Sequence, residues 1–383
     1  MVQNKFGEWT WVVALGGMMA PFAVMSAQAQ ADTVVKIGFS SPLSGPQAHY
    51  GKDNENATRM AIDDLNAKGL VVGGQKVKFE MVSEDDQADP RVGTQAAQRL
   101  VDAGVKAVIG HFNSGVSIPA SKIYFDAGIP QLSVSTNPTY TQQGYKTTFR
   151  LVGSDSQVGG ALGQFAVKTL KAKSIVAIDD RTAYGQGLAD EFVKSVTANG
   201  GKVLRREYTT DKATDFTSIL TSVKAVNPEV IFYGGADAQA APMAKQLKRL
   251  GMKAKLMGGD MLNTPNFITL AGADAAGHYS AVPGGVLTAR PAGKEFEKRY
   301  KDRFHLDVVL LGPQFYDGVM LVAEAMKQAG SVEPAKYLPK LASIRYSGVT
   351  ADFAFDRSGN LQKAPVTLSV VKNNAWAVES VVR

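Results

Sequence analysis

Residues 105–115 read VKAVIGHFNSG, a short aliphatic run that stops at Gly110 and passes into a polar turn. Runs of four to eight β-branched and aliphatic residues bounded by glycine are typical of buried strands in parallel sheets. In such sheets ligands bind beyond the carboxyl ends of the strands, where the following helix presents free N–H groups. The stretch therefore predicts an α/β fold with a ligand site near Asn113 and Ser114.

The same alternation of short strands and amphipathic helices continues on both sides of this stretch. Further strands are predicted from Val34, Val77, Ser174, Val230 and Ala254, and helices after Asp89-Pro90, Tyr184-Gly185, Asp215 and Asp237 and over 312–329. These elements form two blocks, 34–150 and 154–281. The tail from about residue 283, with a strand-rich end, is either a third unit or material shared between two lobes, and chain economy favours sharing.

Composition excludes several kinds of site. The chain has 383 residues and no cysteine, so disulfides, thiol nucleophiles and cysteine-bound zinc or iron–sulfur centres are ruled out. The formal net charge is +7, but lysines and arginines are scattered among acids rather than gathered in a basic stripe. Nucleic acid is therefore not expected as a partner.

The N-terminus carries an apolar run from Trp9 to Met25, which ends in the small residues of SAQAQA. This pattern predicts a secretory signal peptide over residues 1–31, cleaved after Ala29 or Ala31. The alternative is a membrane anchor. The run is short for that role and is interrupted by Gly16-Gly17 and Pro21.

The ends of the predicted strands supply two kinds of group. Ser114, Ser135 and Thr136 offer hydroxyls and backbone amides in the first block. Tyr184 and Asp260 offer an aromatic ring and an acid in the second. This division fits a zwitterion, although each Ser or Thr could instead cap a helix and Tyr184 could simply pack. Asp260 follows two glycines, which allow close approach of the backbone to another group.

Enzymatic chemistry has little support. The sequence contains no P-loop, GxGxxG, HExxH or GxSxG motif, and its four histidines lie at no metal-ligand spacing. Asp179, Asp180 or Asp260 could serve as a general base, but no nucleophile or cofactor loop accompanies them; Asp179 and Asp180 are better explained as a helix cap or solvated loop. We expect no metal, no cofactor and no enzymatic activity.

A series of segments in one order matches a known family. The segments are KIGFSSPLSGPQAHYG, AIDDLNAKGL, DDQADPR, AVIGHFNSGVSIPAS, STNPTYTQQGYKTTFR, DDRTAYGQGLA, IFYGGADAQ, LMGGD and DRSGNL. Over nearly all of the chain from Val34, the sequence resembles the periplasmic leucine/isoleucine/valine-binding proteins of ABC importers. The resemblance implies a type I periplasmic binding protein: two Rossmann-like lobes with parallel central sheets joined by a three-segment hinge. Lobe 1 would comprise 32–152 with about 283–356, and lobe 2 would comprise 153–282 with about 357–383.

The resemblance also implies roles for individual residues. Ser114 and Thr136 would hold an α-carboxylate, while the Ser135 carbonyl, the Thr136 hydroxyl and Asp260 would take the α-ammonium. Tyr184 would close the site, and the side-chain pocket would be lined by Tyr50, Phe112 and Asn113. The chain departs from the family at three places. Ala236 stands where leucine binders carry an aromatic residue. Ala88 and Asn113 stand where some relatives have a disulfide, and Asp260 stands where some have Glu.

The function implied is capture of an aliphatic, branched-chain type L-amino acid in the periplasm and its delivery to the membrane permease of an ABC importer. The protein would act as a monomer. An alternative function is possible for the same fold. The protein would then be a sensor, or would bind an amide, urea or another small molecule, and its ligand would not be a zwitterion.

Overall fold

The computed structural model describes residues 7–10 and 33–382. The predicted signal peptide lies outside these residues except for Gly7–Thr10. Asp32–Arg383 form one compact unit. In the described part of the chain, no helix is long and apolar enough to cross a membrane.

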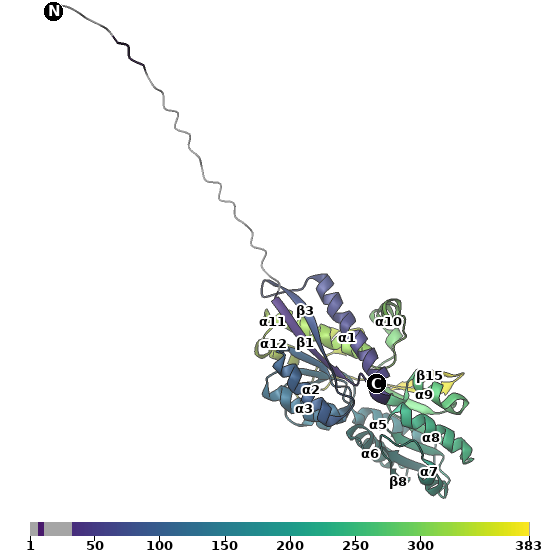
Figure 1. The fold of residues 1–383 in the computed structure, drawn as a ribbon. Coiled ribbons are helices and arrows are strands. Elements are labelled where there is room, and N and C mark those ends of the chain that lie inside the picture. Colours follow the sequence, from purple (N-terminus) through teal and green to yellow (C-terminus); the bar gives the residue numbers. More distant parts are fainter. Residues whose placement is uncertain (1–6, 11–32, 383) are drawn as a thin grey trace, which may run out of the picture. The chain divides into compact units, whose positions relative to one another are not determined.

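Lobe 1 is built on a six-stranded sheet in the order β2-β3-β1-β4-β5-β6, parallel except where β2 pairs with β3. Helices α1 and α11 pack together on one face, and α2 and α3 pack together on the other (Figure 1). The strands are β1 (Thr33–Ser41), β2 (Val71–Val72), β3 (Gln75–Asp85), β4 (Ala107–Gly110), β5 (Gln131–Ser133) and β6 (Thr148–Arg150). The helices are α1 (Ala48–Lys68), α2 (Pro90–Asp102), α3 (Ser114–Asp126), α4 (Thr139–Gln142), α10 (Pro291–Phe304), α11 (Gly312–Ala329) and α12 (Pro334–Ala342).

Lobe 2 is built on a seven-stranded sheet in the order β15-β14-β11-β10-β9-β7-β8. Its strands are β7 (Ile175–Asp179), β8 (Val203–Tyr208), β9 (Val230–Gly234), β10 (Lys255–Gly258), β11 (Tyr279–Pro283), β14 (Val366–Lys372) and β15 (Ala375–Val382). The helices are α5 (Asp155–Gln164), α6 (Ala183–Ala198), α7 (Thr217–Lys224), α8 (Asp237–Arg249) and α9 (Pro265–Ala271). Successive residues of β9 point to opposite faces, so Phe232 packs with α5 and α6 whereas Ile231 packs with α7 and α8.

The chain passes between the lobes three times, after β6, after β11, and between β13 (Asp352–Phe353) and β14. The tail is therefore shared: α10, α11 and α12 cover lobe 1, while β14 and β15 extend the sheet of lobe 2 by antiparallel pairing. The predicted two-lobed α/β fold is confirmed. The lobe boundaries to the residue stay a prediction.

Local sequence signals explain where elements begin. The carboxylate of Asp89 accepts hydrogen bonds from the N–H groups of Arg91 and Val92, and Pro90 takes the first helical position of α2.

The predicted helix over 312–329 coincides with α11. The strand-rich end is less regular than expected, because before β14 it contains only the short pair of β12 (Tyr346–Ser347) and β13.

Side chains of lobe 1 reach lobe 2 at several points. The Tyr50 hydroxyl donates to the carbonyl of Met261 at 2.6 Å, and Asn137 Nδ2 donates to the carbonyl of Ala183 at 2.6 Å. These hydrogen bonds hold the two lobes in a closed arrangement.

Candidate ligand-binding site

The predicted site residues lie where strands of both lobes end. In lobe 1, β4 leads into Phe112, Asn113 and Ser114, and β5 leads through Val134 into Ser135 and Thr136. In lobe 2, Tyr184 lies in the first turn of α6, after β7. Asp260 begins the short helix η3 (Asp260–Leu262) after β10. This is the position expected for a ligand in open parallel sheets.

These residues enclose one small cavity between the lobes. Its lining comprises Phe112, Asn113, Ser114, Val134, Thr136, Tyr184, Asp260 and Met261. Its volume is about 10 Å³, close to the minimum that holds one water molecule. A larger ligand therefore requires the lining of the two lobes to move apart and close again.

The lobe 1 side of the cavity offers donors for an anion. Ser114 is the first residue of α3, and the carbonyl of Asn113 accepts the N–H groups of Val116 and Ser117. Within the described residues, the N–H groups of Ser114 and Gly115 have no backbone partner. Because the N-terminus of a helix also carries partial positive charge, this corner favours a carboxylate without any arginine or lysine.

The lobe 2 side carries a buried acid. Asp260 is 3% exposed, and its Oδ1 accepts a hydrogen bond from the Tyr184 hydroxyl at 2.9 Å. Burial raises the pKa of Asp260 to about 6, although the Tyr184 hydroxyl opposes the shift. Gly259 permits this contact, because a Cβ there would lie 2.3 Å from the Tyr184 hydroxyl oxygen. The close approach predicted for the double glycine is therefore present.

A second acid, Asp155, was not predicted from the sequence. Asp155 is the first residue of α5, and its N–H donates to the carbonyl of Thr136 at 2.8 Å. Both of its carboxylate oxygens are buried without a hydrogen-bond partner. Burial raises the pKa of Asp155 to about 7, with the charge of Asp260 adding to the shift and Thr136 and Arg150 opposing it. In the sequence, an acid after Ser154 at a helix start looks like an ordinary first-turn residue, so no signal distinguished it.

Asp260 in the cavity lining and Asp155 beside the lining residue Thr136 are thus two buried carboxylates for which the described residues show no ion pair. The charge of Arg150 acts on Asp155, but the donors of Arg150 are engaged by the Ser135 carbonyl, Thr141 and Asn360. The hydroxyl of Thr136 is also buried without a partner. Unpaired buried polar groups cost free energy, so this arrangement favours a ligand that brings a cationic donor.

On the remaining wall, Phe112 and Asn113 line the cavity as predicted. Tyr50 is not among the lining residues: it is fully buried and stacks on Phe112 with ring centroids 5.1 Å apart. The Asn113 Nδ2 donates to Gln47 Oε1 at 2.8 Å, while its Oδ1 is buried without a partner. This wall therefore combines an aromatic ring with one buried acceptor that has no partner.

Other candidates lie outside this lining. Ser135 is buried nearby, with its hydroxyl unpartnered and its carbonyl accepting from Arg150. Ala236 is buried as the N-cap of α8. Asp180 accepts hydrogen bonds from the N–H and hydroxyl of Thr182, and Asp179 pairs with Arg206. Both acids are buried and the N-cap of α6 is Thr182, so the prediction that they form a helix cap or a solvated loop is wrong.

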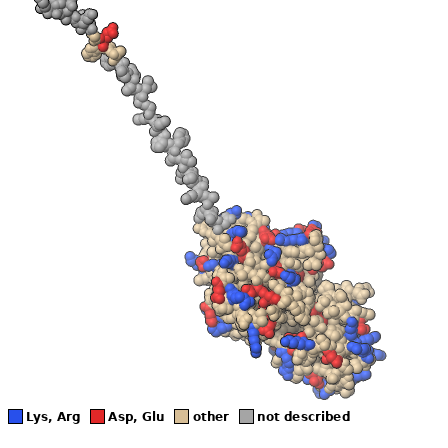
Figure 2. Space-filling view, viewed as in Figure 1, with Lys and Arg blue, Asp and Glu red and all other residues tan. Residues whose placement is uncertain are grey.

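Charge and metal chemistry add little elsewhere. Lysines and arginines are interspersed with acids over the visible face of the molecule (Figure 2). Among residues 7–10 and 33–382, no three His, Cys, Asp or Glu side chains are grouped so that they could hold a metal ion.

Comparisons with known proteins identify the family and the fold. Residues 34–375 match the family described as "Periplasmic binding protein". The chain is 33% identical over 348 residues to the "Leu/Ile/Val-binding protein homolog 1" of Brucella suis, covering 90% of this chain and 92% of the relative. It is 30% identical to the "Leucine-, isoleucine-, valine-, threonine-, and alanine-binding protein" of Pseudomonas aeruginosa, covering 91% and 93%. The structure of the Streptococcus pneumoniae branched-chain amino acid transporter binding protein LivJ with isoleucine superposes with a TM-score of 0.83 at 26% identity, covering 91% and 99%.

Proposed function

Because the chain belongs to the family of periplasmic binding proteins, we propose that it captures a small aliphatic L-α-amino acid between its two lobes and delivers it to the permease of an ABC importer. The relatives named above bind branched-chain and other small amino acids by their names or titles, which supports this ligand class. We propose further that the signal peptide is removed on export to the periplasm, and that the protein works as a monomer without catalysing a reaction.

One observation carries the proposal: the buried acid Asp260 lines the same small cavity as Ser114 at the N-terminus of α3, and a second buried acid, Asp155, lies directly behind the lining residue Thr136, to whose carbonyl its N–H donates. An α-amino acid matches both sides, with its carboxylate at Ser114 and Thr136 and its ammonium at the acids. Charge-assisted hydrogen bonds of this kind each contribute roughly 1.5–3 kcal/mol. A ligand without a cationic group, such as a simple amide, would leave both acids unpaired.

Binding is coupled to closure in this scheme. Lobe 1 supplies the carboxylate donors and lobe 2 supplies Tyr184 and Asp260, so only the closed form contacts both ends of the ligand. A ligand with higher affinity for the closed form shifts the population toward it. The permease would then recognise the closed protein.

Titration calorimetry with L-alanine, L-threonine, L-valine, L-leucine and L-isoleucine tests the proposal, with acetamide and benzoate as ligands that lack an ammonium group. We expect at least one L-amino acid to bind and its D-enantiomer to bind far more weakly. Asp260→Ala should weaken that amino acid more than tenfold, whereas Asp102→Ala on the exposed end of α2 should not. Binding of acetamide or benzoate with no response to any amino acid would overturn it.

A further inference from the structure

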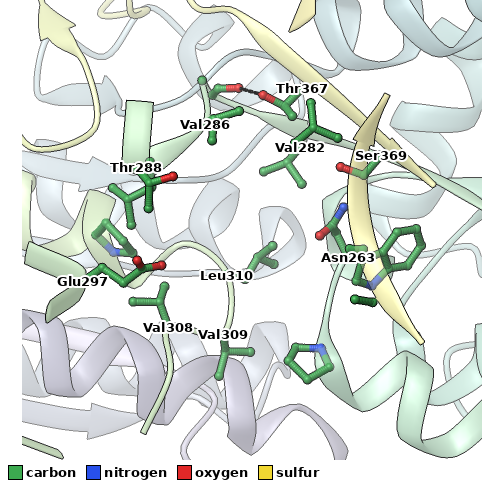
Figure 3. A pocket seen from close by; sticks show the side chains of 18 of the residues that line it. Asn263, Val282, Val286, Thr288, Glu297, Val308, Val309, Leu310, Thr367 and Ser369 are labelled. Carbon is green, nitrogen blue, oxygen red and sulfur yellow. Dashed lines mark hydrogen bonds between the residues drawn. The ribbon is translucent and has the colours of Figure 1, made fainter. Parts of the chain in front are cut away.

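A second and larger cavity lies where the hinge meets both lobes (Figure 3). Its volume is about 630 Å³, within the range of roughly 300–1,000 Å³ typical of small-molecule sites. We call it the hinge groove; its walls are α9, the segment after β11, α10, the start of α11 and the β14–β15 hairpin. It shares no lining residue with the cavity that contains Asp260.

Most of the hinge groove is apolar. Val286, Val309 and Leu310 line it (Figure 3), together with the indole of Trp376. The loop that carries Val309 and Leu310 is fixed to α1, because the Asp53 carboxylate accepts the N–H groups of Leu310 and Gly312 at 3.0 Å each. These walls suit an aliphatic or cyclic ligand body.

Two buried polar atoms in the hinge groove lack partners. Gln314 is 9% exposed, and its Oε1 makes no hydrogen bond. Asn263 is half-buried, and its Nδ2 is a buried atom without a hydrogen-bond partner. The Gln314 amide lies against the hinge wall, where a Cβ on Gly284 would be 3.6 Å from Gln314 Nε2. Because buried polar groups are normally satisfied, a ligand that offers a donor to Gln314 and an acceptor to Asn263 would complete both.

The charge of the lining residues decides whether the hinge groove favours a cation or an anion. Glu297 is the single ionisable residue in the lining, and it makes no ion pair within the described residues. The nearby Lys301 is paired with Asp307 at 2.7 Å. Glu297 and Asn263 project into the cavity from opposite sides (Figure 3). The groove therefore favours a cation beside Glu297, while Trp376, next to Asn263, contributes apolar contact area at the opposite end.

We propose that the hinge groove is a second ligand site, for a small organic ammonium ion with an aliphatic body and one hydrogen-bond acceptor. The ammonium group binds Glu297 and Gln314, and the acceptor binds Asn263. An anionic ligand is disfavoured, because no lysine or arginine lines the groove.

The site is placed to influence the amino-acid site. Trp376 Nε1 donates to the carbonyl of Thr264 at 3.0 Å, and Thr264 lies in the loop that begins with Asp260. Since the groove walls come from both lobes and the hinge, its shape changes when the lobes rotate. Occupancy of one site therefore changes the affinity of the other by a reciprocal factor. This coupling, unlike the second site itself, rests on the proposed function.

Trp376 provides a direct readout. The three tryptophans of the chain are Trp9, Trp11 and Trp376, and the first two lie in the predicted signal peptide. In the secreted protein, fluorescence titration with 6-amino-1-hexanol should saturate, while 1-hexanol binds at least tenfold more weakly and hexanoate gives no signal. Glu297→Gln and Gln314→Leu should each weaken 6-amino-1-hexanol at least tenfold. The control Glu295→Gln, two residues away on α10 and exposed, should not.

The outcomes separate the two proposals. No saturable response to 6-amino-1-hexanol, or an affinity unchanged by Glu297→Gln, overturns the second site. Binding that depends on Glu297 in a protein that ignores all amino acids would keep the second site and overturn the proposed function. If both ligands bind but neither alters the affinity of the other by twofold, the coupling is wrong.

Discussion

His49 on α1 and Asp237 at the start of α8 join the two lobes through a contact of 2.9 Å between His49 Nε2 and Asp237 Oδ2. Asp237 is fully buried, and the same oxygen accepts hydrogen bonds from the Thr264 hydroxyl at 2.6 Å and from Asn266 Nδ2 at 3.1 Å. His49 thus docks onto an oxygen that lobe 2 already holds in place. The contact exists only when the lobes are closed.

His49→Ala should favour the open form. We expect amino-acid dissociation to accelerate about three- to tenfold, in line with about 0.5–1.5 kcal/mol for one hydrogen bond, with little change in association. Stopped-flow measurements of the ligand-bound protein check this. His305→Asn, at an exposed left-handed position after α10, removes a histidine outside this contact and should leave the rate unchanged. An unaltered rate in His49→Ala would mean that the contact does not stabilise closure.

Asp155→Asn should stabilise the ligand-free protein at high pH and weaken its binding of amino acids. Burial raises the pKa of Asp155 from 3.8 to about 7, so the folded protein holds this proton more tightly than the unfolded chain does. The stabilisation from this proton is full below about pH 4 and is lost as the pH rises toward 7. The variant should therefore increase the free energy of unfolding at pH 8 by up to about 4 kcal/mol and change it little at pH 4.

Urea denaturation of the ligand-free protein at both pH values measures this effect. Asp102→Asn, at the exposed end of α2, is the matched control. A destabilised Asp155→Asn protein at pH 8 would show that this carboxylate has a stabilising partner in the folded protein. The same variant should bind amino acids more weakly, because one acceptor for the ammonium group is gone.

Amino-acid affinity should fall as the pH drops from 8 to 5. The pKa values of Asp155 and Asp260 are raised by burial to about 7 and about 6, and the ammonium group needs both acids ionised. Binding should therefore release protons near pH 6 to 7. Calorimetry in buffers of different ionisation enthalpy measures that release. An affinity that stays constant over this range would place the ammonium group elsewhere.

Asn113→Leu should shift selectivity toward purely aliphatic side chains. Asn113 Oδ1 lines the cavity wall as a buried acceptor without a partner, which penalises an apolar ligand group beside it. We expect the ratio of leucine to threonine affinity to rise about fivefold or more. Competition of the two amino acids against a common labelled ligand gives the ratio directly. Gln47→Leu removes the partner of Asn113 Nδ2 and serves as the control.

The sequence could predict features that depend on local chemistry. Asp89-Pro90 marks a helix start whatever surrounds it, and the two glycines before Asp260 imply close approach of another group. Asp155 was missed because its role depends on burial against Thr136 and on the proximity of Asp260, which is more than 100 residues away in the chain. The hinge groove was missed for the same reason, since Asn263, Glu297 and Gln314 meet only through the hinge.

The pairing of β14 with β11 has a consequence for the order of folding. Residues 366–382 supply β14 and β15 to the sheet of lobe 2, although all of lobe 1 precedes them in synthesis. Until those residues are made, β11 is an unpaired edge and the core of lobe 2 lacks Leu368 and Val371. A chain emerging from the ribosome therefore cannot complete its second lobe early. Lobe 2 therefore gains its complete sheet only once residues 366–382 have been made, after every strand and helix of lobe 1.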